Sequence, residues 1–383
     1  MIEPDYSFNR AVIDLAALRH NFSCLQKLCP LRPLMAVVKG DAYGHGLTEC
    51  ARALVQAGAR NLGVLDAHEG LILRKTLPEP ADIYVLAGLQ TREQIKAALD
   101  NRLIPVIYSL PQMQLVENII QAGRPTEAYL KIDTGMGRLG LPWFEIQTVL
   151  PALLRKTKIH FRGLMTHLAT AGDADARIQL DRFQRAADLD RKLGLTGGRH
   201  SALAGPGLLA YPEYNDHLSR AGLLLYGGNP LENEPERLSE AGRRTVKKLK
   251  PVMSLVSQII QVRTVRAGET ISYDRTFTAP RDMRIAAVPL GYVHGLARSR
   301  SGQGCALTGG RPAPLLGRVC MNLSLYDVTQ TEAQAGQEIV LLGRDGRKQI
   351  TPAQAAQWQG TSAYEIFCLF GRLNSRIYTD GAD

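Results

Sequence analysis

Short apolar segments recur along the first 227 residues of the chain, and most of them are followed by a segment with helical periodicity. The apolar segments are rich in β-branched residues, as buried strands are, and their starts lie about 20 to 40 residues apart. Eight strand–helix units over roughly 200–250 residues predict a closed (β/α)8 barrel. The predicted strands are residues 35–39, 62–66, 82–87, 103–109, 128–133, 160–167, 199–204 and 218–227. The clearest predicted helices are residues 47–57, 92–101, 110–122 and 176–193.

An open, doubly wound sheet is the alternative arrangement for alternating strands and helices. Such a sheet more often has roughly five to seven strands and a glycine-rich first turn. This sequence has eight apolar runs, and that turn is absent from it. The number of units therefore favours the barrel.

The pattern changes after Gly228. Residues 229–236 are rich in Pro, Asn and Glu, as loops and linkers are, and alternating segments dominate from Met253 onward. We therefore predict an α/β protein with an N-terminal TIM barrel over residues 1–240 and a mostly β domain over residues 241–383. Residues 11–15 are also strand-like, so residues 1–15 could pair with the second domain. Its predicted strands are residues 255–265, 284–288, 313–316, 323–328 and 338–342.

Composition and charge narrow the class of protein. Of the 383 residues, 45% are hydrophobic and 21% are charged, which is usual for a globular protein. No apolar run reaches the length of about 18 residues that a membrane span needs. The amino-terminal residues include early acids and lack the apolar core of a secretory signal. These features predict a cytoplasmic protein.

The cysteines could indicate a metal site, and the positive charge could indicate a nucleic-acid site. The sequence favours neither site. The six cysteines form no CxxC pair and no cysteine–histidine spacing typical of zinc, so we expect reduced thiols and no metal. The net charge is +10, and the densest basic cluster lies in residues 243–250. Glutamates precede this cluster and no aromatic residue interrupts it, which favours a solvated helix over a nucleic-acid surface.

Candidate chemistry lies where the predicted strands end, because a barrel of this kind carries its active site at that edge. Lys39 takes the last position of an apolar strand, where an ammonium group is costly to bury without a partner. A desolvated lysine with a lowered pKa suits Schiff-base chemistry, although a lysine that reaches solvent from a strand end is the plainer interpretation. The other residues at these ends are Asp66, Asp133 with Arg138, His167, Ala204 and residues 220–222.

Residues 36–46, AVVKGDAYGHG, resemble the pyridoxal-phosphate lysine motif of alanine racemases. The resemblance extends over nearly the whole chain, in family order and at family spacing. It implies a barrel followed by a β domain, which matches the architecture predicted above. The further matching segments are residues 131–140, 165–167, 220–223, 271–273, 289–292, 317–321 and 363–365.

The resemblance implies two catalytic bases. Lys39 would bind pyridoxal 5'-phosphate covalently and act as one base, and Tyr273 would act as the other from the opposite face of the substrate Cα. Racemisation needs two such groups, because one removes the proton and the other returns it with inverted geometry. A phenol with a pKa of about 10 is a poor base at neutral pH, and His167 is a candidate to assist it.

The resemblance also assigns the cofactor contacts. Arg220 would face the pyridine nitrogen, where many other pyridoxal enzymes place a carboxylate. Arginine accepts no proton, so the ring would stay neutral. Tyr43, Gly222 and Leu223 would bind the phosphate, the last two through backbone N–H groups.

The substrate contacts that the resemblance implies come from both domains. Arg138 would bind the substrate carboxylate with its planar donor fork. Lys131 matches a position that is often carbamylated, which would orient Arg138. Tyr292 would stand at the entrance, and Met321 would reach the substrate from a second subunit. A homodimer with composite active sites follows from this assignment.

The sequence departs from the family at several positions near the phosphate and the entrance. The phosphate loop has Ala204 and Gly205 where a hydroxyl donor is usual, and Asn322 follows Met321 where an aspartate is usual. Both implied bases are retained. The remaining departures are Leu203, Met165 before His167, His294 in the entrance segment, and Gly371.

The leading prediction is a pyridoxal-phosphate racemase that interconverts L-alanine and D-alanine and supplies D-alanine for cell-wall peptidoglycan. A racemase for serine, lysine or a broad range of amino acids is the close alternative, because the departures cluster at the entrance. A non-catalytic pyridoxal-phosphate barrel is a weaker alternative, since such proteins lack the β domain. Related barrel decarboxylases are disfavoured because no glycine triplet is present for their phosphate site.

Overall fold

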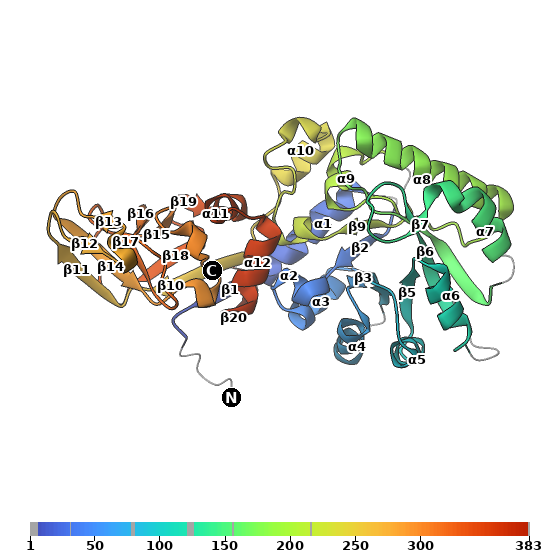
Figure 1. Ribbon diagram of the computed structural model, residues 1–383, viewed down its shortest axis with the longest axis horizontal. Coiled ribbons are helices and arrows are strands. Elements are labelled where there is room, and N and C mark those ends of the chain that lie inside the picture. Colours follow the sequence, from blue (N-terminus) through green and yellow to red (C-terminus); the bar gives the residue numbers. More distant parts are fainter. Residues whose placement is uncertain are drawn as a thin grey trace. The chain divides into compact units, whose positions relative to one another are not determined.

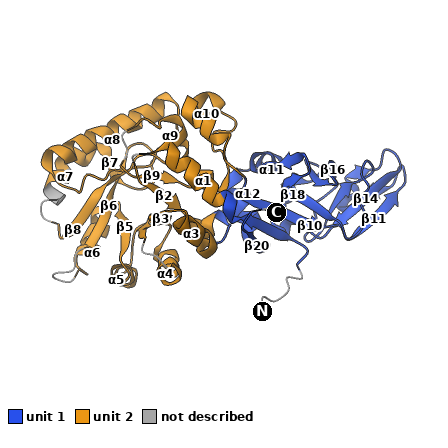
Figure 2. Cartoon of the chain, turned by 180° about the vertical axis from the view of Figure 1, so that it is seen from behind, with its two compact units in different colours: residues 1–17, 43–46, 251–383 blue, residues 18–42, 47–250 orange. Residues whose placement is uncertain are grey.

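The computed structural model describes residues 7–30, 32–77, 81–120, 126–154, 157–214 and 217–381. Contacts divide the chain into two compact units, coloured separately in Figure 2. Unit 1 comprises Met1–Ala17, Tyr43–Gly46 and Pro251–Asp383, and unit 2 comprises Leu18–Ala42 and Leu47–Lys250. The domain limits predicted from the sequence, residues 1–240 and 241–383, remain a prediction.

Unit 2 is built on parallel strands. Strand β2 pairs with β3 on one side and with β9 on the other, and the order continues from β3 through β4, β5 and β6 to β8. Strands β2 and β5 are buried along their whole length, as strands are when both faces of a sheet are covered. The strands are β2 (Leu34–Val37), β3 (Asn61–Val64), β4 (Asp82–Val85), β5 (Leu103–Ile107), β6 (Thr126–Asp133), β7 (Leu141–Pro142), β8 (Ile159–Met165) and β9 (Ser219–Ala221).

Residues 199–204 close the ring of strands between β8 and β9. They were predicted as a strand and instead form only isolated parallel bridges, yet their backbone bonds to both neighbours. The Ser201 N–H donates to the Leu164 carbonyl at 2.8 Å, and the Arg220 N–H donates to the Leu203 carbonyl at 3.0 Å. The prediction of a parallel α/β barrel is confirmed.

The prediction of a last barrel strand over residues 218–227 is wrong for the second half of that range. Strand β9 ends at Ala221, and residues Leu223–Tyr226 form a buried 3-10 helix, η2. Gly222 between them has φ −117° and ψ −102°, which is outside the strand region. Apolar periodicity cannot separate a short buried helix from a buried strand.

Helices follow most strands of unit 2, and Figure 1 shows α3 to α6 beside strands β2, β3, β5 and β6. The predicted helix over residues 110–122 ends at Glu117, and residues 121 and 122 lie outside the described part of the chain. Within that part, no helix combines the length and apolar character that crossing a membrane requires. The helices are α1 (Leu15–Leu28), α3 (Leu47–Gln56), α4 (Ala67–Thr76), α5 (Arg92–Asp100), α6 (Leu110–Glu117), α7 (Ile146–Leu154), α8 (Ala174–Leu193), α9 (Gly205–Ala210) and α10 (Glu240–Val246).

Unit 1 is mostly β, as predicted. Strand β1 (Arg10–Asp14) pairs with β10 and β20 of this unit, so the amino-terminal strand is part of the second sheet. The sheet order is β11-β14-β17-β16-β15-β18-β10-β1-β20, with β19 on β18. Its strands are β10 (Met253–Gln258), β11 (Gln261–Val265), β14 (Met283–Val288), β15 (Cys305–Thr308), β16 (Arg311–Leu316), β17 (Ser324–Asp327), β18 (Glu338–Asp345), β19 (Lys348–Ile350) and β20 (Ser375–Thr379). Strands β12 (Thr270–Ile271) and β13 (Phe277–Thr278) pair separately, and helices α11 (Pro352–Gln359) and α12 (Ala363–Arg372) precede β20.

The predicted strand over residues 255–265 is two strands. They separate at Ile259 and Ile260, because β10 pairs with β1 and β18 whereas β11 pairs with β14. The Ile259 N–H donates to the Gln337 carbonyl and the Ile260 N–H to the Ala287 carbonyl, each at 2.9 Å. The two isoleucines thus mark a change of partner strand.

Candidate active site

Lys39 is followed by a left-handed turn of the backbone. Gly40, Asp41 and Ala42 have φ/ψ of 66°/43°, 57°/46° and 54°/48°, and Tyr43 has φ 55°. A left-handed conformation costs roughly 1–2 kcal/mol for each residue that carries a Cβ atom. Strain of this kind persists where surrounding contacts enforce it, and it clusters at functional sites.

Glu69 on α4 holds this turn. Its Oε1 accepts the Asp41 N–H at 3.0 Å and its Oε2 accepts the Leu65 N–H at 2.8 Å, while Asp41 Oδ1 accepts the Leu47 N–H at 2.7 Å. Glu69 was not among the predicted site residues. The signal that could have found it is the capping pattern of Asp66 and Glu69 three residues apart, since Asp66 caps α4 by accepting the Glu69 N–H.

Positive charges gather around Lys131 at the carboxyl ends of the barrel strands. Lys131 is buried on β6, and its pKa is lowered to about 8 by that burial and then by the charges of Arg220, Arg138 and Lys39. These mutual effects bring four of the cations that the sequence placed on separate strands into one cluster. A cluster of this charge favours anionic ligands.

His167 lies in the same cluster, just after β8. Its pKa is lowered to about 3 by burial first and then by Arg220, Lys131, Arg138 and Lys39. The imidazole is therefore neutral at neutral pH. A neutral ring donates at one nitrogen and accepts at the other, so His167 can hydrogen-bond in the cluster without adding positive charge.

Arg220 is buried on β9 and is oriented by neutral oxygens. Its Nη2 donates to the Thr166 carbonyl at 2.6 Å and to the Ala202 carbonyl at 3.3 Å. Its Nη1 donates to the Ser201 carbonyl at 3.1 Å and also to the Ser201 hydroxyl. These bonds position the guanidinium and leave its charge in place.

The backbone N–H groups of Gly222 and Leu223 are able to make the phosphate contacts that the sequence predicts. Ala204 and Arg220 form a parallel bridge, so the residues that follow them lie at neighbouring strand ends. Within the described chain, the N–H groups of Gly222 and Leu223 have no acceptor. Ala204 precedes α9 without a side-chain hydrogen bond, which agrees with the missing hydroxyl. Free N–H groups at such ends are suited to phosphate oxygens.

Arg138 is exposed in the loop that follows β6. Asp133 shapes this loop, since its Oδ1 accepts the N–H groups of Gly135 at 2.9 Å and Gly137 at 3.1 Å. Gly135 and Gly137 have φ of 148° and 67°, which side chains with a Cβ rarely adopt. Arg138 therefore extends from a defined loop beside Lys131 and is accessible to a substrate carboxylate.

In unit 1, the backbone around Tyr273 is also unusual. Ser272, Asp274 and Arg275 have φ of 67°, 59° and 50°. The Ser272 hydroxyl donates to the Arg318 carbonyl at 2.8 Å. Asp274 Oδ2 lies 3.5 Å from both Arg298 Nη2 and Arg318 Nε. The sequence did not predict the contact of Ser272 or a role for Asp274, because their partners lie far away in the sequence.

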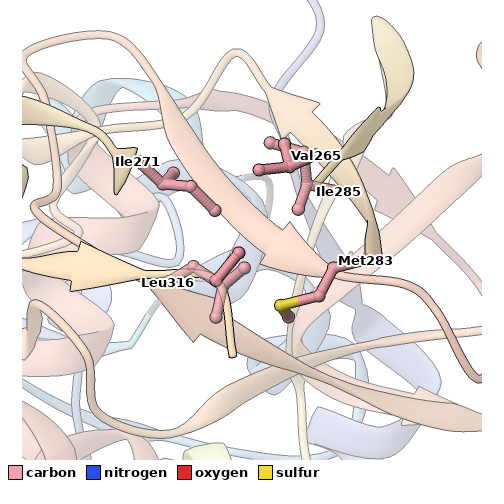
Figure 3. Close-up of a cluster of buried hydrophobic side chains, with 6 residues drawn as sticks. Val265, Ile271, Met283, Ile285 and Leu316 are labelled. Carbon is pink, nitrogen blue, oxygen red and sulfur yellow. The ribbon is translucent and has the colours of Figure 1, made fainter. Parts of the chain in front are cut away.

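A buried apolar cluster fixes the two segments that meet beside Tyr273. Ile271, just before Ser272, and Leu316, just before Gly317, pack with Val265, Met283 and Ile285 (Figure 3). A Cβ atom on Gly317 would lie 2.9 Å from Ser272 Cβ, so this close approach requires glycine. Tyr273 is therefore carried by a backbone that is packed on its inner side, while its own side chain is 66% exposed.

Tyr292 and Met321 belong to the same group in unit 1. The Tyr292 N–H donates to the Cys320 carbonyl, and the Val293 N–H to the Met321 carbonyl, each at 3.1 Å. The side chains of Tyr292 and Met321 are 41% and 55% exposed. The structure thus places both residues on segments that pack beside the one carrying Tyr273.

Tyr43 belongs to unit 1 although it follows the turn after Lys39. Its ring lies 6.1 Å from that of Tyr364 on α12, and burial, followed by the nearby Tyr364 and Cys368, raises its pKa well above the usual value. Its hydroxyl is therefore protonated at neutral pH and can donate to a phosphate oxygen. Tyr364 was noted in the sequence only as part of a matching segment, and its contact with Tyr43 makes it a further candidate.

The predicted site residues thus form two groups, one in each unit. Lys39, Arg138, His167 and Arg220 gather in unit 2, and Tyr273, Tyr292 and Met321 in unit 1. Among the described residues, no group of three or more His, Cys, Asp or Glu side chains is arranged to hold a metal ion. The donor set of unit 2, with an amine, a guanidinium and free backbone N–H groups, fits pyridoxal phosphate, which offers an aldehyde, a ring nitrogen and a phosphate.

Comparison with protein families gives two matches. The N-terminal domain of alanine racemases matches residues 13–230, and their C-terminal domain matches residues 252–378. The chain is 38% identical over 378 residues to the alanine racemase of Syntrophobacter fumaroxidans, and the match covers 96% of this chain and 97% of that protein. Both domains and their order are therefore shared.

Solved structures give the same result. The alanine racemase of D-cycloserine-producing Streptomyces lavendulae superimposes with a TM-score of 0.88 at 32% identity and covers 99% of both chains. The alanine racemase of Bartonella henselae, with covalently bound pyridoxal phosphate, gives a TM-score of 0.85 at 26% identity, covering 97% of this chain and all of that one (100%).

Proposed function

The chain belongs to the alanine racemase family, and we propose that Lys39 and Tyr273 are its two catalytic bases. It is a pyridoxal-phosphate-dependent isomerase that interconverts L-alanine and D-alanine. The observation that carries the assignment is the backbone at both residues. Lys39 precedes a left-handed turn, and Tyr273 lies between two residues of positive φ. Strained segments that the fold maintains are expected where a side chain must be held for chemistry.

Each base acts on one face of the substrate. When bound, pyridoxal phosphate withdraws electrons from the substrate and makes its Cα proton acidic. The amine of Lys39 holds the cofactor and exchanges the Cα proton on one face, and the phenol oxygen of Tyr273 exchanges it on the other. Inversion follows because the proton leaves toward one residue and arrives from the other.

The remaining residues of unit 2 bind and orient. Arg220 would hold the ring nitrogen of the cofactor and, because it has no acceptor atom, would leave that nitrogen unprotonated and the electron withdrawal moderate. Gly222 and Leu223 donate their N–H groups to the phosphate, and Arg138 pairs with the substrate carboxylate through its planar fork. His167 hydrogen-bonds beside the cofactor in its neutral form.

The phosphate and substrate contacts from unit 1 complete this assignment. Tyr43 donates its hydroxyl to the phosphate, Tyr292 lies at the substrate entrance, and Met321 contacts the substrate from a second subunit. The exposed side chains around them support an interface, because Tyr273, Tyr292 and Met321 are accompanied by Val293 and Leu323, which are also exposed. Contiguous exposed apolar side chains mark interaction sites. We therefore propose a homodimer with composite active sites, which sedimentation of the holoenzyme would test.

A cytoplasmic location and a supply of D-alanine for the cell wall remain proposals as well. The second is supported by chemistry, since D-alanine is a constituent of bacterial peptidoglycan and the relatives compared above are bacterial.

The substrate assignment can be tested by chiral chromatography of the purified holoenzyme with L-alanine, L-serine and L-lysine. We expect D-alanine to form at least about tenfold faster than either other D-amino acid, and Lys39→Ala to abolish the reaction. Faster formation of D-serine or D-lysine would favour the racemase of another amino acid, for which His294 and Asn322 provide the sequence signal. If none of the three amino acids is converted, the non-catalytic pyridoxal-phosphate protein is favoured.

A further inference from the structure

Arg300 is a buried cation outside the site described above. It ends the short 3-10 helix η6 (Arg298–Arg300) of unit 1, and it is 0% exposed. Arginine is rarely buried to this degree unless its charge is paired.

The guanidinium of Arg300 has few partners. Its Nη2 donates to the Cys305 carbonyl at 2.9 Å, and its centre lies 4.8 Å from the ring centroid of Trp358 on α11. Its Nε and Nη1 are buried and donate to no described residue. Within the described ranges, no Asp or Glu carboxylate oxygen lies within 4.0 Å of it. One face of the group is thus stacked, and two of its nitrogens lack acceptors.

The charge of Arg300 stays uncompensated by its ionisable neighbours. A guanidinium is not deprotonated in proteins, so the positive charge remains in the interior. The nearest ionisable groups are Cys305 and Tyr326, and burial raises the pKa of both side chains, which keeps them neutral at neutral pH. A buried charge without a counter-charge is among the most costly arrangements in a folded protein.

A second unpaired donor lies on the adjoining residue of α11. Gln359 follows Trp358, and its Nε2 is buried without an acceptor among the described residues. Its Oε1 accepts the Ala297 N–H at 3.2 Å, and its carbonyl accepts the Ser299 hydroxyl at 3.1 Å. Gln359 is therefore fixed against the segment that leads into Arg300. The two orphaned nitrogens of Arg300 are donors, so the group that they lack is an acceptor.

We propose that Arg300 binds a small monovalent anion of the chloride class in the interior of unit 1. A water molecule could accept hydrogen bonds from Nε and Nη1, but only an anion also balances the charge. Complete burial favours a compact ion over a phosphate or a carboxylate ligand. The ion would tie η6 to α11 and so brace the segment between Tyr292 and Cys305.

Thermal unfolding of the holoenzyme in sodium chloride and in sodium gluconate, at equal ionic strength, tests this site. A ligand that binds only the folded state raises the unfolding midpoint with its concentration. We expect chloride to raise the midpoint of the wild-type protein by about 2 °C or more, with saturation. Arg300→Met keeps an unbranched apolar side chain and removes the guanidinium and its charge, so the chloride-specific rise should disappear.

Arg347→Met is the matched control, because Arg347 is an exposed arginine of the same unit and should keep the chloride response. A chloride effect that arises at the cation cluster of unit 2 would persist in Arg300→Met, so only the difference between the variants reports on Arg300. Equal responses in all three proteins would overturn the proposal.

A crystallographic measurement keeps the proposal testable if Arg300→Met fails to fold. Crystals of the wild-type holoenzyme grown in sodium bromide should show an anomalous peak within about 3.5 Å of Arg300 Nε or Nη1, the range of a charged hydrogen bond to a halide. An absent peak, with a water or a carboxylate of the chain in its place, would overturn it.

Discussion

At the residue scale, the cations of unit 2 change one another's chemistry. Lys131 is buried among Arg220, Arg138 and Lys39, and its pKa falls to about 8. Burial, and then the same charges, lower the pKa of His167 and keep it neutral. A neutral lysine amine is a nucleophile, whereas its ammonium form is not. The cluster thus makes Lys131 reactive at a pH where a solvent-exposed lysine is inert.

The neutral amine of Lys131 should react with carbon dioxide. Its neutral nitrogen would attack the carbon of CO2 and release one proton, which leaves a carbamate anion beside Arg138. Because about half of the Lys131 amines are neutral at pH 8, the carbamate should increase between pH 7 and 8.5. Carbon-13 NMR of the holoenzyme in labelled bicarbonate would detect it. A signal that survives in Lys131→Gln, or no signal at pH 8.5, would contradict this.

The missing hydroxyl at Ala204 should weaken cofactor binding. One hydrogen bond to a charged group contributes about 1.5–3 kcal/mol, which is roughly tenfold or more in affinity. We expect Ala204→Ser or Gly205→Ser to lower the dissociation constant of pyridoxal phosphate from the apoenzyme, measured by absorbance titration. A Cβ atom at Gly205 would meet no atom within 4 Å, so there is room to begin a side chain there. If neither variant changes the constant, the backbone N–H groups already suffice.

At the scale of elements, the strands could be predicted where apolar, β-branched runs are buried on both faces. Strands β2, β5 and β6 follow from that pattern alone. The pattern could not show where a buried run changes conformation, as at Gly222, or changes partner strand, as at Ile259. It also could not show the left-handed turn after Lys39, because that turn depends on Glu69 of a later helix.

The close packing beneath Tyr273 leads to a prediction for Gly317. Its Cβ position is blocked by Ser272 Cβ at 2.9 Å and the Ile271 carbonyl at 3.0 Å, and its φ is 61°. Gly317→Ala should lower the free energy of unfolding by about 2–3 kcal/mol and kcat by roughly tenfold or more, because the segment carrying Tyr273 must move.

Gly268→Ala is the control for Gly317→Ala. Gly268 also has a positive φ, 84°, but nothing lies within 4 Å of its Cβ position. It should cost only about 1 kcal/mol of stability and leave kcat unchanged. Denaturant unfolding and racemisation assays on both variants would check this. Equal effects of the two substitutions would show that the contact with Ser272 does not position Tyr273.

At the scale of the whole molecule, the two candidate bases belong to different units, and the chain itself passes from unit 2 to unit 1 just after Lys39. The order of motifs along the sequence predicts both bases. It could not name Glu69, Asp274 or Tyr364, since their roles depend on contacts between distant segments. Arg300 had no sequence signal at all, because burial of a charge is visible only in the folded chain.

The division of work between Lys39 and Tyr273 is most directly tested by proton exchange at Cα. Tyr273→Phe removes the proton acceptor and keeps the ring, so cofactor binding should survive. Racemisation should fall in both directions by about 10²–10⁴-fold, the usual contribution of a general acid–base group. Tyr214→Phe, which removes a hydroxyl that bonds to Gln184, is the control and should retain activity.

The decisive measurement is proton NMR of each alanine enantiomer with Tyr273→Phe holoenzyme in deuterated water. If Lys39 takes the Cα proton of D-alanine and Tyr273 that of L-alanine, D-alanine should still exchange its Cα proton with retention. Exchange of L-alanine should largely vanish. Equal loss of exchange from both enantiomers, or selective loss from D-alanine, would contradict the assignment of Tyr273 as the base for L-alanine.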